Sequence, residues 1–174
     1  TESVGIRGSY HEKEHYKGWC KESLANTKDM IMHKLGVDKV YVNKKIFIAR
    51  KNGGSSNVAN YKELASLLVD YGYTELDPGD MSVKEQITAF SSASHIVSVH
   101  CEAMANIIWT DSSTNIVELR SSENDDPSYR MIAGMRDMKN YQVLFCDPVD
   151  PHDRGISDFV VDTTGMKLLL NEYV

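Results

Sequence analysis

The 174-residue chain has few cysteines, no long apolar run and no excess of basic charge. Its three cysteines, Cys20, Cys101 and Cys146, have no C-x-x-C spacing, which excludes a zinc ribbon and a dithiol redox motif. The odd count leaves at least one thiol unpaired, and this favours a reducing, cytoplasmic compartment over a secreted one. Because no run of about 18 apolar residues is present, we expect no membrane-spanning segment.

The charge argues against a nucleic-acid binder. The chain carries 19 basic and 25 acidic residues, a net charge of −6, whereas nucleic-acid binders usually carry a basic excess. The distribution is uneven: residues 1–60 hold 11 basic and 6 acidic side chains, and residues 61–174 hold 8 and 19. A basic stretch in an acidic chain indicates either a site for a small anion or an uneven, solvated surface.

Strand and helix signals alternate along the chain, with short links and near-continuous apolar strands. This alternation is typical of a parallel sheet covered by helices on both faces. We therefore predict an α/β fold, a single Rossmann-like doubly wound sheet over residues 19–174, preceded by a loose arm or linker over residues 1–18. The expected helices are 19–35, 61–71, 82–93, 101–109, 128–138 and a last one from 163; the expected strands are 46–48, 73–76, 95–99, 115–119, 141–145 and 159–161.

Capping residues predict where three of these helices begin. Asn60 and Thr163 stand at the starts of two helices, and Ser82 with Glu85 has the spacing of a capping box. The first helix is expected to bury one face, which holds Leu24, Met30, Ile31 and Leu35.

Ligands of such sheets bind at the carboxyl ends of the strands, so the loops after Ile48, Val99 and Leu119 are the places to look. The first of these loops, residues 50–57, offers cations, glycines and hydroxyls, which are groups that hold phosphate oxygens. It matches neither the dinucleotide fingerprint nor the P-loop, and a plain surface turn is the alternative. Its candidate ligands are Arg50, Lys51, Ser55 and Asn57.

The second loop begins at His100 and opens a predicted helix, where the helix dipole favours an anion. His100 could donate to a phosphate there, or it could be a structural histidine that satisfies a nearby carbonyl. His95 and His100 lie about 16 Å apart along one strand, so they cannot share a metal, and no metal site is predicted.

The third loop follows the strand that holds Glu118. A carboxylate near the end of a parallel strand can bind two vicinal hydroxyls, as acidic residues do for ribose. Alternatively, Glu118 pairs with Arg120 or faces water. Asp125 and Asp126 are interpreted as a solvated loop. A serine-hydrolase site is excluded because no G-x-S-x-G motif is present.

Several segments, which occur in the same order as the family's motifs, resemble glycosyltransferase family 61. The resemblance runs from about Trp19 to the end of the chain. KKIFIARK resembles the family's basic strand end, which places Arg50 and Lys51 at its basic positions. MSVKEQITAF is similar to its L-S-F-x-E-Q-x-x-L-F helix, SASHIVSVH leads into its G-x-H-G-A-G-L-x-N loop, and TNIVELR resembles its V-I-E-L strand. SYRMIAGMRDMKNYQVL and DFVVDTTGMKLLL resemble the final helix and the closing strand and helix.

This resemblance implies the carboxyl-terminal, donor-binding lobe of a two-domain GT-B enzyme that inverts configuration and needs no metal or other cofactor. Arg50 would neutralise the phosphate of a nucleotide-sugar, and Glu118 would hold ribose or support the loop from His100 to Asn106. The acceptor would be a glycan or protein hydroxyl. The general base is expected outside the chain, in a missing amino-terminal lobe, with His100 as the candidate within it.

One departure from the family pattern concerns the loop after His100. Cys101 stands where the family has its first glycine, and the second glycine is also replaced. Glu102 brings a carboxylate close to the expected diphosphate, and like charges repel unless the side chain points away. His100 and Asn106 are kept. The alternative function is therefore a catalytically silent module that binds carbohydrate or protein.

Overall fold

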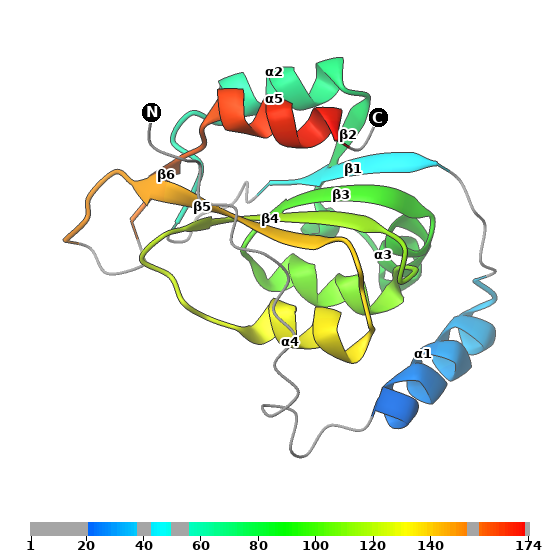
Figure 1. The fold of residues 1–174 in the computed structure, drawn as a ribbon. Coiled ribbons are helices and arrows are strands. Elements are labelled where there is room, and N and C mark those ends of the chain that lie inside the picture. The colour runs from blue at the N-terminus through cyan, green and yellow to red at the C-terminus, as the bar shows by residue number, and fades with distance from the viewer. Residues whose placement is uncertain (1–20, 38–42, 50–55, 153–156, 173–174) are drawn as a thin grey trace.

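The computed structural model describes residues 21–37, 43–49, 56–152 and 157–172 (Figure 1). None of the helices in these ranges is long and apolar enough to cross a membrane. The elements in chain order are α1 (Lys21–Leu35), β1 (Lys44–Ile48), α2 (Tyr61–Asp70), β2 (Tyr73–Leu76), η1 (Pro78–Asp80), α3 (Val83–Ser91), β3 (Ala93–Val99), η2 (Glu102–Trp109), β4 (Asn115–Ser121), α4 (Ser128–Met135), β5 (Tyr141–Pro148), β6 (Phe159–Val160) and α5 (Thr163–Asn171).

The strands form one sheet in the order β2-β1-β3-β4-β5-β6. The first five run parallel, which confirms the prediction of a parallel α/β sheet. The last strand differs from that prediction, because β6 is antiparallel to β5. The strand order reverses between β1 and β3, and ligands of doubly wound sheets bind at such a switch point.

Helices cover both faces of the sheet (Figure 1). On one face, α2 and α5 pack over apolar side chains such as Phe47, Val97 and Leu144. On the other face, α3, η2 and α4 pack over Ile46, Ile96 and Ile116. Successive strand residues point to opposite faces, so near-continuous apolar strands can fill both cores.

The first helix turns most of its predicted face inward: Leu24, Ile31 and Leu35 are partly buried, and Ile31 and Leu35 pack against the cluster around Met32. Met30, expected to be buried, is 63% exposed, whereas Lys28 and Met32 are buried. The ammonium of Lys28 donates to the main-chain oxygen of Thr110 at 2.7 Å, next to the end of η2, where unpaired carbonyls favour a cation. The apolar pattern missed Lys28 on this face because a buried lysine does not contribute to such a pattern.

The three helices begin where predicted, within one residue, but only one of the three predicted capping contacts forms. Ser82 and Glu85 form the complete capping box at the start of α3. Asn60 stands at the N-cap of α2 but makes no capping bond; its amide pairs with the main chain of Val161. Asp162 replaces Thr163 as the cap of α5. In both failures the predicted residue has a partner far away in sequence.

Candidate functional site

A polar cluster lies where β3 and β4 end, on the face covered by η2 and α4. Ser98 and Glu118 are register partners in these strands and are both fully buried. His100 follows β3 directly, and its backbone N–H donates to the carbonyl of Leu119 at 2.8 Å. The cluster is thus at the carboxyl edge of the sheet, beside the switch point, where ligands of this architecture bind.

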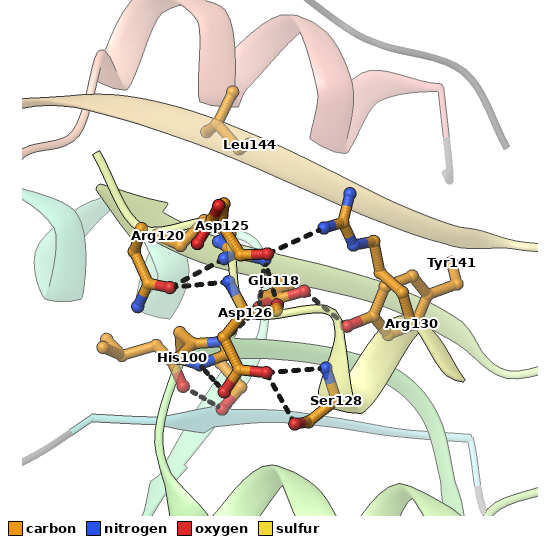
Figure 2. Close-up of polar contacts among 12 residues, drawn as sticks. His100, Glu118, Arg120, Asp125, Asp126, Ser128, Arg130, Tyr141 and Leu144 are labelled. Atoms are coloured by element: carbon orange, nitrogen blue, oxygen red, sulfur yellow. Dashed lines mark hydrogen bonds and ion pairs between the residues drawn. The ribbon is translucent and has the colours of Figure 1, made fainter. Parts of the chain in front are cut away.

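Glu118 is the centre of this cluster. One of its carboxylate oxygens is hydrogen-bonded to Nδ1 of His100, and the other accepts the hydroxyl of Tyr141 at 2.5 Å (Figure 2). Since a carboxylate only accepts, Nδ1 carries the proton in this pair. Burial, with the Glu118 charge and hydrogen bond, raises the pKa of Tyr141 well above its ordinary value. Tyr141 therefore remains a hydrogen-bond donor at neutral pH.

The side chain of Glu118 is 1% exposed, and that of His100 is 12% exposed. Glu118 was predicted to hold ribose or to support the loop that begins at His100. Its burial and its bond to His100 favour the second role. This arrangement resembles the acid and histidine of a catalytic triad, in which the acid fixes the orientation of the ring and leaves Nε2 available for chemistry.

Arg120 is a fully buried cation two residues after Glu118. Its guanidinium lies 3.7 Å from the Glu118 carboxylate, which compensates part of that buried charge. It also donates to the main-chain oxygen of Asp126 at 2.7 Å and to the side chain of Asn124 at 2.8 Å. Burial lowers the pKa of Arg120, and Glu118 opposes that shift. The arginine thus folds the loop between β4 and α4 over the end of the sheet.

This loop brings Asp126 to the second ring nitrogen of His100. Oδ2 of Asp126 lies 3.4 Å from Nε2, and Oδ1 accepts from the main chain and hydroxyl of Ser128 at 2.9 and 2.6 Å (Figure 2). The Ser128 hydroxyl bond, together with the nearby His100, lowers the pKa of Asp126. The side chain is 46% exposed, so it combines a fixed position with access to solvent.

Tyr129 completes the surroundings of His100. Its ring centroid lies 4.9 Å from that of the imidazole, with a tilt of 58° between the planes. Burial, followed by the nearby acidic groups, raises the pKa of the Tyr129 hydroxyl to about 12. The ring restricts access to His100 from the α4 side.

The other predicted ligands of the His100 loop are placed as follows. Cys101 is buried and Glu102 is exposed at the start of η2, a 3-10 helix where an α-helix had been expected. Asn106 donates to Gln86 of α3 at 2.9 Å and accepts from the Trp109 indole at 3.1 Å. The amide of Asn106 thus ties η2 to its neighbours.

The predicted phosphate loop is described only in part. Arg50, Lys51 and Ser55 lie outside the described residues. Asn57 is described: its backbone and side-chain N–H groups both donate to Asp158 next to β6, at 2.8 and 3.0 Å. These bonds connect the segment before α2 to the segment before β6. The phosphate-binding role of the loop stays a prediction.

The decisive similarity covers more than half of the chain. The model of a family described as Glycosyltransferase 61 matches residues 9–117. The chain belongs to the glycosyltransferase 61 family. No curated protein matches it.

The matched region of this glycosyltransferase family 61 chain ends one residue before Glu118. It includes His100, but Arg120, Asp126 and Tyr141 lie beyond it. From the sequence, Arg120 was predicted only as a possible ion-pair partner of Glu118, and Asp126 only as part of a solvated loop. Tyr141 was not predicted to belong to the site. The two-residue period of side chains along β4 could have indicated Arg120, because Arg120 points to the same face of the sheet as Glu118. Within the described ranges, no group of three or more His, Cys, Asp or Glu residues could hold a metal ion.

Proposed function

We propose that this chain is the donor-binding lobe of a glycosyltransferase that moves a sugar from a nucleotide-sugar to a hydroxyl of a glycan or protein, in glycan or polysaccharide synthesis. The observation that supports this most strongly is the position of His100. It follows β3 at the switch point of the sheet, is held by the buried Glu118, and lies inside the matched family region.

In this proposal the donor diphosphate lies across the carboxyl edge of the sheet. Arg50 and Lys51 neutralise its charge, and the amides at the start of η2 donate to its oxygens, near Cys101 and Glu102. The resemblance to glycosyltransferase family 61 implies inversion at the anomeric carbon without a metal. Fixed cations and amide dipoles then stabilise the charge that develops on the leaving group.

The reaction needs a base for the acceptor hydroxyl, and the proposal places that base in an amino-terminal lobe outside these residues. The chain is therefore part of a catalytic unit, and whether it transfers hexose or pentose depends on contacts with the donor sugar. Glu102, which is exposed on the loop, does not have to oppose the diphosphate if its side chain keeps pointing into solvent.

Calorimetric titration with UDP, GDP and their sugars tests this proposal. We expect one of these nucleotides to bind, and Arg50→Ala to weaken its binding at least tenfold, because a charge-assisted phosphate contact is lost. Lys84→Ala removes an exposed cation from α3 as the control, and we expect unchanged affinity. No binding of any nucleotide at millimolar concentration would overturn the proposal and favour the silent carbohydrate- or protein-binding module.

A further inference from the structure

His100 is badly placed to hold a phosphate, because each of its ring nitrogens faces a carboxylate. Nδ1 is bonded to Glu118, and Nε2 lies 3.4 Å from Oδ2 of Asp126 (Figure 2). A phosphate on Nε2 would approach Asp126 at a distance where like charges repel strongly. A ligand that reaches this edge of the ring, whose side chain is 12% exposed, needs a chemistry that suits both Nε2 and the carboxylate.

Asp126 is held in place by several contacts and keeps its negative charge. Its Oδ1 accepts from the N–H and the hydroxyl of Ser128. The main-chain oxygen of Asp126 accepts from Arg120, and its N–H donates to Asn124 at 3.0 Å. The lowered pKa of Asp126 keeps it ionised at neutral pH. Oδ2 is therefore an acceptor in a fixed position, on a side chain that is 46% exposed.

A neutral hydroxyl satisfies both atoms at once. When Nε2 carries a proton, it donates to the hydroxyl oxygen, and the hydroxyl donates its own proton to the carboxylate oxygen. With 3.4 Å between Nε2 and Oδ2, a hydroxyl oxygen can lie at ordinary hydrogen-bond distance, about 2.7–2.9 Å, from both. A vicinal diol can use the two atoms separately.

We infer that Asp126 and Nε2 of His100 form a hydroxyl-binding pair that recognises a sugar hydroxyl of the donor, either on its ribose or on its transferred sugar. The inference rests on the proposed function, since it takes the ligand to be a nucleotide-sugar. It makes Asp126 a specificity-determining residue, with Glu118 positioning His100 behind it. The phosphates lie elsewhere along the carboxyl edge of the sheet.

The pair is tested first without any nucleotide. The ring nitrogens of His100, assigned with His100→Gln, are followed by ¹⁵N NMR while methyl riboside, methyl glucoside or inorganic phosphate is added. One of the two glycosides should shift these signals, which distinguishes ribose from the transferred sugar, and phosphate should leave them unmoved. Phosphate shifts that exceed both glycoside shifts would overturn the inference.

Variants then assign the effect to Asp126. Asp126→Asn and Asp126→Ala should weaken glycoside binding at least fivefold, because a site built for a hydroxyl loses affinity when its acceptor is removed. Ser128→Ala, which loosens Oδ1 without changing the charge, should weaken it less. Asp125→Asn is the matched control for charge in the same loop. Equal glycoside affinity in wild type and in both Asp126 variants, with folding confirmed by thermal unfolding, would refute the pair.

Nucleotides separate failure of the pair from failure of the proposed function. UDP, 2′-deoxy-UDP and UDP-glucose are titrated into wild type and Asp126→Asn. We expect at least a fivefold preference for the ligand that carries the recognised hydroxyl, and Asp126→Asn should abolish this preference. Nucleotides that bind without any such preference would refute the pair and leave the proposed function standing. A glycoside effect without nucleotide binding would refute the proposed function and leave the pair standing.

Discussion

The two faces of the sheet solve the problem of burial in different ways. Under α2 and α5, the strands bury a mostly apolar cluster around Phe47 and Leu144, and the partly buried Glu75 of the edge strand β2 accepts from the hydroxyl of Tyr61 at 2.5 Å. Under η2 and α4, the same strands bury Glu118 and Arg120 next to Ile116. Burying charges is costly unless they are paired and hydrogen-bonded, so the face with Glu118 and Arg120 needs more polar contacts than the mostly apolar face. The difference indicates that one face mainly stabilises the fold and the other holds the chemistry.

Loss of Arg120 should have the largest effect on stability. Arg120→Met removes the cation near Glu118 and the donors that hold Asn124 and the carbonyl of Asp126. We expect the free energy of unfolding to fall by about 3–5 kcal/mol, because a buried charge loses its partner. Urea unfolding measures this, and Arg130→Met on α4 is the control with a smaller expected loss. Equal losses in the two variants would mean that Arg120 is not the organiser of the polar face.

A cavity in the apolar face should cost somewhat less and leave the site intact. Leu64 of α2 is fully buried, and Leu64→Ala should lower the free energy of unfolding by about 3 kcal/mol. Leu168→Ala removes a side chain that is 64% exposed on α5 and should change stability by about 0.5 kcal/mol or less. If Leu64→Ala also shifts the NMR signals of His100, the two faces are not independent.

Lowering the pH should remove a small contribution of Asp126 to the free energy of unfolding. Since the pKa of Asp126 is lowered in the folded protein, its contribution to stability is present above its unfolded pKa, about 4, and is lost as the pH falls through the folded value. Asp126→Asn should cost less than about 1 kcal/mol at pH 7, because the group is half exposed, and progressively less as the pH falls below about 4. Urea unfolding of both proteins from pH 7 to 3 measures this. A difference that grows on acidification would contradict the assignment.

Local patterns predicted the elements well but not the contacts that make the site. The capping box at Ser82 and the apolar strands depend on short-range spacing, so the structure confirms them. His100 and Glu118 were each singled out, and support of the His100 loop was one of two roles expected of Glu118; the sheet register is what brings the two side chains together.

Contacts between distant segments have no such local pattern. The hydroxyl of Tyr141 reaches Glu118 from a strand 23 residues later, and no spacing indicates this contact. The burial of Lys28 in α1 was missed for a similar reason, since this lysine pairs with the main chain of Thr110. Arg50, Lys51 and Ser55 stay predictions, because they lie outside the described residues.

The position of the donor is the central claim, and the ring signals of His100 during a nucleotide titration test it most directly. We predict that UDP or the preferred nucleotide-sugar shifts the ¹⁵N signals of His100 in proportion to the calorimetric saturation, and that Arg50→Ala moves the midpoint of both curves at least tenfold. Calorimetric binding that leaves the His100 signals unmoved would contradict the claim, because the nucleotide would then lie away from the carboxyl edge of β3 and β4.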